Sequence, residues 1–286
     1  MFKRIIKTVL MASLVVAMGA SLAGCGSSSD AITVITREEA SGTRGAFVEI
    51  VDITVNGNDN IYQEAVVAPG TSVMMTNVAE NPYAIGYAST GVALNDNRVR
   101  VLTVNGVFPS VENMLNGSYA IQRPFKIGHI RDGVSELAQD FIDFIMSAQG
   151  QDVVAGRGYV PFIPSGAPTY TPSGLTGSIV VNGSSSVYPL MQRLREAYEA
   201  LNPGVTIDIH GAGTGQGISA ARDGLADIAM SSRDFRESEL EFIAPLTIAI
   251  DGIAVIVHPD NNIGNLTLAQ IRDIFLGEIS TWDDVR

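Results

Sequence analysis

The sequence predicts an α/β fold, with helices packed over largely buried sheets. Three observations lead to this expectation. Short apolar runs alternate with segments of helical periodicity along the chain, which is typical of α/β layers. Hydrophobic residues make up 46% of the sequence, ample for a buried core. Beyond the N-terminal leader, no apolar run is long enough to cross a membrane.

The leader, residues 1–24, is an export signal that precedes the fold. "MFKRIIKTVLMASLVVAMGASLAGC" begins with cations, continues with a short apolar run and ends in small residues before Cys25. The pattern resembles a bacterial lipoprotein signal, in which residues 1–24 are removed and Cys25 is lipidated. The alternative is an ordinary secreted protein with an unmodified cysteine. The composition of residues 25–30 predicts a short flexible tether. Because Cys25 is the single cysteine, we expect no disulfide and no thiol metal site.

The mature part of the chain carries a net negative charge. Residues 1–24 carry three cations and no acids, so their removal changes the formal net charge from −12 to −15. Such a charge argues against nucleic acid or anionic lipid as a binding partner. The 262 residues from Cys25 to Arg286 suit one large domain or two modest ones.

The first part of the chain is expected to hold three strands and two helices. The strands are "AITVIT" (31–36), "YAIGYAS" (83–89) and "RVRVLTV" (98–104). One helix starts at about Gly45. The other covers 134–150, where apolar residues recur with a period close to 3.6.

The second part follows an extended linker at about 163–177, which is rich in Pro, Gly, Ser and Thr. Strands and helices again alternate there. The expected strands are 178–183, 205–211 and 226–232, and the expected helices are 188–204 and 217–224.

Hydroxyl-rich or glycine-rich turns follow four of the predicted strands. In the first turn, the backbone N–H groups and hydroxyls of Ser41 to Thr43 open a helix, and a helix start attracts anions. Arg37, at the strand end, adds a forked and permanently charged donor, and Glu39 is expected to hold its other face. One such turn on its own is more often an ordinary helix cap. Four of them in one acidic chain are much less expected to be four unrelated caps.

The remaining turns are "NGSSSVYPL", "HGAGTGQGISAA" and "MSSRD". The second offers the hydroxyl of Thr214, but it lacks the lysine of a Walker loop and the last glycine of a dinucleotide fingerprint. His129, His210 and His258 lack metal-ligand spacing, and no nucleophile elbow is present in the sequence. We therefore expect no metal, no cofactor and no catalysis.

These stretches resemble the phosphate-binding proteins of bacterial ABC importers. The resemblance covers 31–162 and 178–286 and lies in specific segments. They are "ITREEASGTRGAF", "ENPYAIGYAS", "GSYAIQRPF", "VNGSSSVYPLMQRLREAYEALNPGV", "GAGTGQGI", "ADIAMSSRDF", "IAIDGIAVIVHPDN" and "LTLAQIRDIFLGEISTWDDV". The family implies a two-lobe, type II periplasmic-binding-protein-like fold. Its ligand lies in the cleft between the lobes and is held almost entirely by hydrogen bonds.

The resemblance also implies a set of phosphate ligands. Glu39 falls on the acid that positions Arg37. Some family members carry an aspartate where this chain has Ser232, and that aspartate accepts the proton of bound hydrogen phosphate. Serine accepts more weakly, so the resemblance implies weaker rejection of sulfate. The implied phosphate-binding residues are Arg37, Ser41, Gly42, Thr43, Ser185, Ser186, Thr214 and Ser232.

The order of the segments differs from the family, which begins with the "GSSSV" loop and reaches "SGTR" only later. The chain therefore resembles a circular permutant, with one lobe continuous over 123–248, including the 163–177 linker. The other lobe is split into 31–119 and 252–286, and strands near 118–125 and 246–252 cross between them. Arg286 should lie near Ala31, and Arg37 and Ser185 should face one cleft. The open alternative is a piece of a tandem pair, in which the two residues would lie far apart.

The function implied is that of a solute-binding lipoprotein on the outer face of the cytoplasmic membrane. It would capture inorganic phosphate and deliver it to the transmembrane subunits of an ABC importer, as a monomer and without catalysis. One alternative is a binder of another oxyanion, such as sulfate or molybdate. Others are a surface phosphoester hydrolase and an adhesion or signalling module that has lost its ligand.

Overall fold

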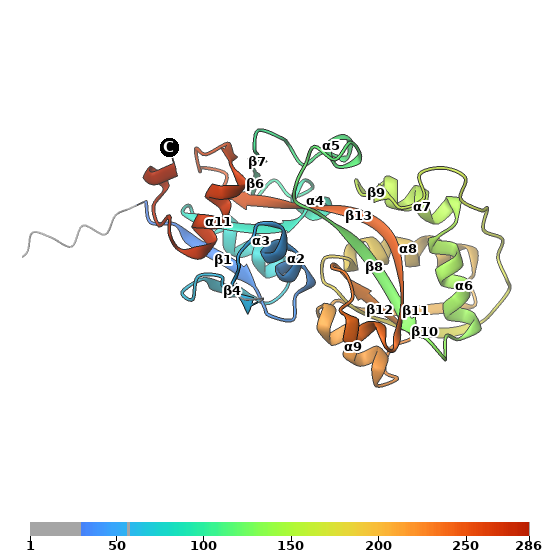
Figure 1. The fold of residues 1–286 in the computed structure, drawn as a ribbon. Helices are drawn as coiled ribbons and strands as arrows, with labels where there is room; N and C mark the ends of the chain where they lie inside the picture. Colours follow the sequence, from blue (N-terminus) through green and yellow to red (C-terminus); the bar gives the residue numbers. More distant parts are fainter. Residues whose placement is uncertain (1–29, 56–57, 286) are drawn as a thin grey trace, which may run out of the picture.

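One long mixed sheet runs through the molecule and carries helices on both faces (Figure 1). The computed structural model describes residues 30–55 and 58–285. In sheet order the main strands are β11 (Val205–His210), β10 (Gly177–Gly183), β12 (Ile228–Ser231), β8 (Gln122–Ile130), β13 (Ile243–Val257), β5 (Ala84–Ser89), β1 (Thr33–Arg37) and β4 (Val66–Ala68).

Short strands complete the sheet and form two small ribbons. β6 (Arg100–Val101) and β9 (Val160–Pro161) pair with β13, β7 (Thr103–Val104) pairs with β14 (Asn265–Leu266), and β2 (Thr54–Val55) pairs with β3 (Asn58–Asp59). The helices are α2 (Gly42–Ile50), α3 (Thr71–Ala79), α4 (Thr90–Ala93), α5 (Val111–Leu115), α6 (Glu136–Ile145), α7 (Ala148–Ala155), α8 (Tyr188–Leu201), α9 (Thr214–Arg222), α10 (Glu237–Leu240), α11 (Leu268–Leu276) and the 3-10 helix η1 (Trp282–Val285).

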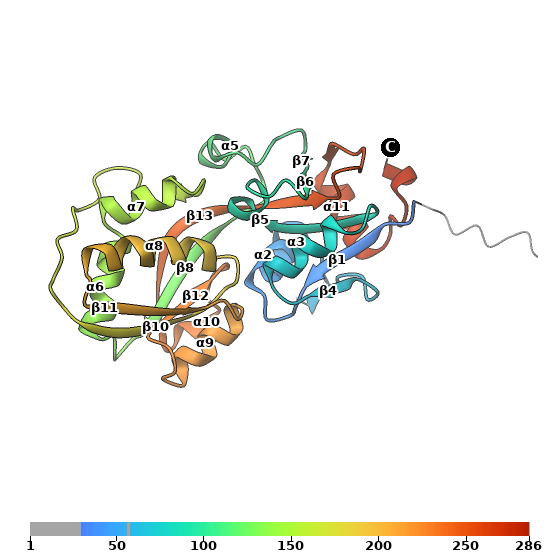
Figure 2. The same ribbon diagram turned by 180° about the vertical axis from the view of Figure 1, so that it is seen from behind.

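The hydrophobic cores divide the molecule into two halves, which lie at opposite ends of the sheet (Figures 1 and 2). We call them the Arg37 half, residues 30–55, 58–121 and 253–285, and the Ser232 half, residues 122–252. In each half, alternate residues of a strand enter cores on opposite faces of the sheet. For example, Val255 packs with the α2 and α11 side, whereas Ile256 packs with α3. This is the two-residue period of a strand covered on both faces.

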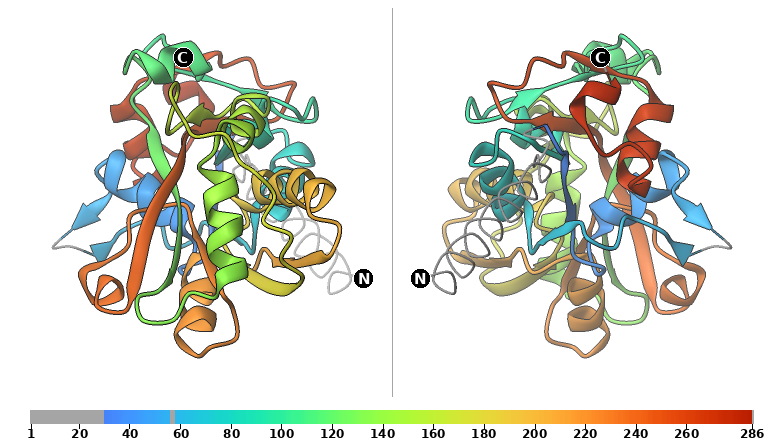
Figure 3. Two further views of the ribbon diagram at one scale, coloured as in Figure 1. Left: turned by 90° about the vertical axis from the view of Figure 1, so that its right-hand side faces the viewer. Right: turned by 90° about the vertical axis from the view of Figure 1, so that its left-hand side faces the viewer.

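Strand β13 belongs to both halves. Its residues 243–252 pair antiparallel with β8 in the Ser232 half, with a bulge between Thr247 and Ala249. Its residues 253–257 pair with β5 in the Arg37 half. The left panel of Figure 3 shows β13 in orange beside β8 in green. The two halves are therefore joined where this pair of strands crosses from one to the other.

The start of the described chain lies beside its end. Ala31 forms an antiparallel bridge with Thr281, and the N–H of Ile32 donates to the carbonyl of Ser280 at 2.8 Å. Arg286, the leader 1–24, Cys25 and the tether up to residue 29 lie outside the described residues. Within the described ranges, no helix combines the length and apolar character needed to cross a membrane.

Three local expectations are corrected by the structure. The segment 134–150 forms two helices, because the hydroxyl of Ser147 accepts from the N–H of Gly150 and starts α7 as a new helix. The first helix starts at Gly42, three residues earlier than expected, because Ser41 caps it. The run 98–104 is divided into β6 and β7, with Leu102 between them.

The expected linker has no helix or strand before Gly177, as predicted, but it is anchored to the Ser232 half. Its Tyr170 is buried and donates its hydroxyl to Asp140 at 2.6 Å. The carbonyl of Pro168 accepts from the N–H of Ala148 at 2.8 Å. The linker therefore packs against helices α6 and α7 of this half.

Candidate anion-binding site

The hydroxyl-rich turns meet between the two halves. Strands β10, β11 and β12 are parallel neighbours, so their carboxyl ends lie at one edge of the sheet. The turn after β1 approaches this edge from the Arg37 half, where the carbonyl of Ala40 accepts from the N–H of Gly215 at 3.2 Å. All four turns that the sequence singled out therefore converge on one region.

Arg37 is the charged centre of this region. It ends β1, and only 2% of its surface is exposed. Its Nε and one Nη donate to both carboxylate oxygens of Glu38, at 2.8 and 2.7 Å. The same guanidinium donates to the hydroxyl of Ser185 in the Ser232 half at 3.0 Å and to that of Thr71 at 3.3 Å. One edge of the Arg37 guanidinium is thus fixed by the Glu38 carboxylate, and its remaining N–H groups point at the hydroxyls of Ser185 and Thr71.

The acid that positions Arg37 is Glu38, so the expectation for Glu39 is corrected. The chain turns after β1, where the N–H of Ser41 donates to the carbonyl of Glu38. This turn keeps Glu38 beside the strand end, where its carboxylate also accepts from the N–H of Gly70 at 3.1 Å. Glu39 is exposed and borders a separate pocket of about 610 Å³ that contains Arg44 and Arg233.

The electrostatics of Glu38 fit this role. Burial alone would raise the pKa of its carboxyl, but the hydrogen bonds and charge of Arg37 outweigh burial, and the pKa is lowered. Glu38 is therefore ionised at neutral pH and holds the guanidinium in place.

A hydroxyl cluster, formed by Thr43, Thr71, Ser185 and Ser186, lies next to Arg37. Thr43 and Ser186 are joined at 2.8 Å between their Oγ atoms, and Thr71 lies 3.2 Å from the Oγ of both serines. Thr43 and Thr71 come from the helix starts of the Arg37 half, whereas the serines come from the turn after β10. Each of these bonds therefore crosses between the halves.

A second hydroxyl group, Ser184, Thr214 and Ser232, lies within the Ser232 half. The hydroxyl of Ser184 donates to the Oγ of Ser232 at 2.9 Å, and the N–H of Ser232 donates to the Oγ of Thr214 at 3.3 Å. Gly42 faces this group, because a Cβ added there would lie 2.7 Å from the Oγ of Ser232 and would also collide with Thr214. The start of α2 can approach so closely only as glycine.

The structure thus brings together all the residues that the sequence predicted as ligands, whereas Glu39, predicted to position Arg37, lies apart from them. Ser41 belongs here as the cap of α2, accepting from the N–H of Arg44 at 3.3 Å. The N–H of Ser186, predicted as a donor to the ligand, donates here to the hydroxyl of Ser184 at 3.2 Å. Sequence reasoning missed Thr71 and Ser184. The "PGTS" turn before α3 was an available signal for Thr71, and Ser184 adjoins the predicted pair in the "GSSSV" loop.

The chemistry of the site is that of an anion receptor. A guanidinium, several hydroxyls and the N–H groups at the starts of α2 and α9 converge, and such donors bind a compact oxyanion. A pocket of about 530 Å³, lined by Thr71, Ser185 and His210 among others, reaches the cluster from solvent. In the part of the chain that the structure describes, no group of three or more His, Cys, Asp or Glu residues could hold a metal ion.

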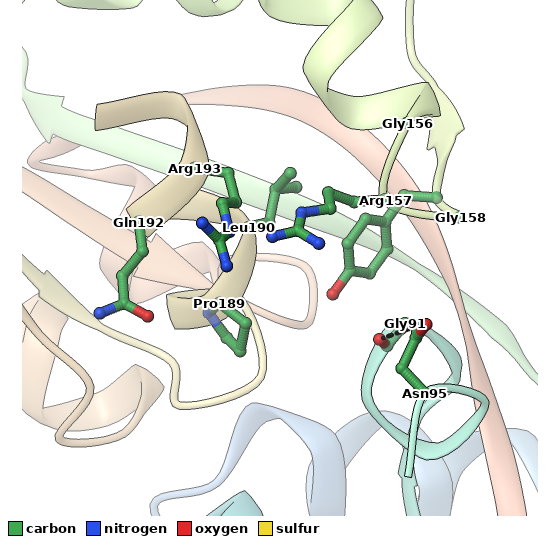
Figure 4. Close-up of a pocket in the computed structure, with 10 residues that line it drawn as sticks. Gly91, Asn95, Gly156, Arg157, Gly158, Pro189, Leu190, Gln192 and Arg193 are labelled. Carbon is green, nitrogen blue, oxygen red and sulfur yellow. Dashed lines mark hydrogen bonds between the residues drawn. The ribbon is translucent and has the colours of Figure 1, made fainter. Parts of the chain in front are cut away.

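Another pocket between the halves lies apart from these hydroxyls. It has a volume of about 340 Å³ and is bordered by Gly91 of the Arg37 half and by Arg157 and Arg193 of the Ser232 half (Figure 4). None of the predicted ligands lines it. The converging turns, and not this pocket, form the candidate site.

Comparison with known proteins gives concordant matches. A family model described as "PBP superfamily domain" matches residues 168–286. The phosphate-binding protein PstS 2 of Streptococcus agalactiae is 40% identical over 92% of this chain and 92% of its own length. A crystal structure of a phosphate-binding protein of a phosphate ABC transporter from Streptococcus pneumoniae TIGR4 has a TM-score of 0.70 and 41% identity, covering 90% of this chain and all of that one. In contrast, the phosphate-binding protein PstS of Pseudomonas aeruginosa is 31% identical over 129 residues, 40% of either chain.

Proposed function

Because the chain belongs to the family of the streptococcal phosphate-binding protein PstS 2, we propose that it captures inorganic phosphate outside the cytoplasm and delivers it to an ABC importer. The observation that carries this proposal is the contact between Arg37 and Ser185. A guanidinium held by Glu38 in one half donates to a hydroxyl of the other, in the middle of converging hydroxyls. Relatives in this family are binding proteins for transport, and this chain is proposed to act likewise, without catalysis.

The phosphate ligands proposed are those expected from the sequence, together with Thr71. In the structure, Thr43, Ser185 and Ser186 bond to one another or to Arg37 across the halves. A phosphate oxygen is a charged acceptor and makes stronger hydrogen bonds than a neutral hydroxyl. Phosphate would therefore replace the hydroxyl-to-hydroxyl bonds. The acidic surface does not prevent this, because salt screens distant charges, whereas Arg37 acts at contact distance.

Capture is proposed to proceed by closure of two lobes, which correspond to the Arg37 half and the Ser232 half. Hinge closure around a ligand is the general behaviour of periplasmic binding proteins. The strands β8 and β13 are the proposed hinge, since they join the halves through few residues near 122 and 252. The proposed lobe boundaries remain 31–119, 123–248 and 252–286.

The chain order is proposed to be a circular permutation relative to other members of the family. Two kinds of alignment support this proposal. The match to S. agalactiae PstS 2 spans nearly all of both chains, so that relative has the same order. The match to P. aeruginosa PstS stops at 40% of either chain, as an alignment does when it meets a changed order. The adjacency of residues 31 and 281 gives a place where a continuous chain could have been opened.

Attachment to the membrane is proposed to occur through a lipid on Cys25, followed by the tether, with the protein acting as a monomer. Its partners would then be the transmembrane subunits of the importer. The supporting observation is the leader sequence that ends in "LAGC". Metabolic labelling with a palmitate analogue should mark the wild type and not Cys25→Ala.

Isothermal titration with phosphate, sulfate and molybdate tests the proposed function. We expect one saturable phosphate site per chain and weaker binding of the other two anions. Absence of phosphate binding, or tighter binding of molybdate or sulfate, would overturn the assignment. Release of phosphate from a phosphoester by the wild type, and not by Arg37→Ala, would instead support the hydrolase alternative.

A further inference from the structure

A fully buried ion pair lies outside the hydroxyls described above, on the two strands that join the halves. Arg123 of β8 and Asp251 of β13 are direct partners in the antiparallel register. One guanidinium nitrogen of Arg123 lies 3.3 Å from a carboxylate oxygen of Asp251, and the side chains are 1% and 0% exposed. Neither residue was assigned a role in binding.

Asp251 connects this pair to the Arg37 half. Its second carboxylate oxygen accepts from the hydroxyls of Ser89 and Thr90, at 2.9 and 2.8 Å. These residues end β5 and start α4. The Thr90 hydroxyl also accepts from the N–H of Gly252 at 3.3 Å. The carboxylate is therefore fixed from the side of the Arg37 half.

Arg123 connects the pair to the Ser232 half. Its other terminal nitrogen donates to the backbone carbonyl of Ser232 at 3.2 Å. Its guanidinium carbon lies 5.3 Å from the centre of the Phe125 ring. The buried Nε has no hydrogen-bond partner among the described residues. Arg123 thus reaches the main chain of Ser232, a proposed phosphate ligand.

A buried ion pair of this geometry contributes little net free energy to folding. Burial lowers the pKa of Arg123 and raises that of Asp251, and each partner opposes the shift of the other. The one contact between the two charges is 3.3 Å long and the Nε is unpaired, so the remaining compensation for burial comes from Ser89, Thr90 and the Ser232 carbonyl. Apolar pairs often stabilise a core as well as such an ion pair does. The pair does form a continuous chain of hydrogen bonds. Through the carboxylate of Asp251 and the guanidinium of Arg123, this chain links Ser89 and Thr90 to Ser232.

We propose that Arg123 is a positioning residue for the anion site, held by Asp251 and acting through the carbonyl of Ser232. This inference rests on the proposed phosphate-binding function. The pair sets the position of Ser232, and of the Thr214 hydroxyl bonded to its N–H, relative to Gly42 of the Arg37 half. The pair would thereby align the proposed ligands of the Ser232 half with those of the Arg37 half.

The test uses the neutral double variant Arg123→Gln/Asp251→Asn, which leaves no unpaired charge buried. We expect its phosphate affinity to be about tenfold lower than that of the wild type. Combined with Ser232→Ala, the loss should shrink by at least about threefold, because the displaced group is already missing. Combined with Ser185→Ala, a ligand on a different turn, the losses should multiply. Wild-type affinity in the double variant, or equal coupling to both serines, would overturn the proposal.

Two further measurements cover the remaining outcomes. In the ligand-free protein, hydrogen exchange should accelerate in segment 230–234 of the double variant and remain unchanged in α11, Leu268–Leu276, which is not bonded to that segment. This readout stands even if the wild type fails to bind phosphate, which would refute only the proposed function. If the double variant does not fold, Thr90→Val removes one hydroxyl from Asp251 at constant shape. It should then weaken phosphate binding, and unchanged binding would contradict the proposed linkage.

Discussion

Two arginine–carboxylate pairs lie near the boundary between the halves, and they differ in the number and length of their contacts and in their burial. Arg37 and Glu38 are neighbours in sequence and meet through two short contacts, with 23% of the Glu38 side chain exposed. Arg123 and Asp251 come from different strands and meet through one contact of 3.3 Å, with both side chains buried. The residue types are alike, but the directions in which the two guanidiniums point are not.

The difference shows how a partner decides what an arginine can do. Glu38 occupies one edge of the Arg37 fork, which leaves the rest to donate to Thr71 and Ser185. Because Glu38 is partly exposed, part of its carboxylate stays solvated, and the desolvation free energy of this pair is smaller than that of a fully buried one. Arg123 divides its donors between Asp251 and the carbonyl of Ser232 and presents none to the hydroxyl cluster. On the proposed function, the first pair would present a donor to phosphate, and the second would hold Ser232, another proposed ligand.

The largest effect should come from Arg37→Ala. This variant removes the guanidinium that links Glu38 to the hydroxyls, and we expect a loss of about 2–5 kcal/mol in phosphate binding free energy. Titration calorimetry is the measurement. Arg98→Ala is the matched control, because Arg98 is 56% exposed and pairs with Asp96 at the surface. A phosphate affinity within twofold of wild type in Arg37→Ala would remove this residue from the site.

Glu38→Gln should have the next largest effect, on the stability of the ligand-free protein. It leaves the buried charge of Arg37 without its carboxylate, and we expect a loss of about 1–3 kcal/mol in the free energy of unfolding. Glu39→Gln is the control and should leave that free energy unchanged, because Glu39 is exposed. Chemical denaturation at neutral pH measures both. Equal losses in the two variants would contradict the assignment to Glu38.

The pH dependence of the difference in unfolding free energy between wild type and Glu38→Gln tests whether the charge of Glu38 is its cause. Burial favours a raised pKa for Glu38, but Arg37 dominates and lowers it. A carboxylate with a lowered folded-state pKa stabilises the protein above its unfolded value of about 4.3, and this stabilisation is lost as the pH falls through the folded value. The stabilities of wild type and Glu38→Gln should therefore converge in acid. A gap that persists at pH values well below the folded pKa would show that charge is not the cause.

The smallest expected effect concerns selectivity at position 232. Ser232→Asp should raise the preference for phosphate over sulfate by about tenfold, because a carboxylate accepts the proton of hydrogen phosphate and repels fully ionised sulfate. Ser232→Asn has nearly the same size without the charge and should not raise it. Competition titrations compare the two. If Asn raises the ratio as much as Asp, the effect is one of shape and position 232 does not read the proton.

Local sequence signals were sufficient for much of the site. The turns after β1, β10, β11 and β12 follow apolar runs and carry hydroxyls or glycines, so their place at strand ends could be predicted. The meeting of Arg37 with Ser185, implied by the family resemblance, is present at 3.0 Å. The helical periodicity gave the wrong length for the expected helix 134–150, because Ser147 caps a new helix within it and divides it in two.

What the sequence by itself determined is the alternation of strands and helices, the acidic charge and the strand-end turns, because these depend on neighbouring residues. The choice between Glu38 and Glu39 depended on how the chain turns after β1. The inclusion of Thr71 depended on where α3 starts in space. The partnership of Arg123 with Asp251, 128 positions apart, depended on the register of two strands. Only the tertiary structure decided these, because the direction of a side chain and its distant partners are fixed by packing and not by adjacent residues.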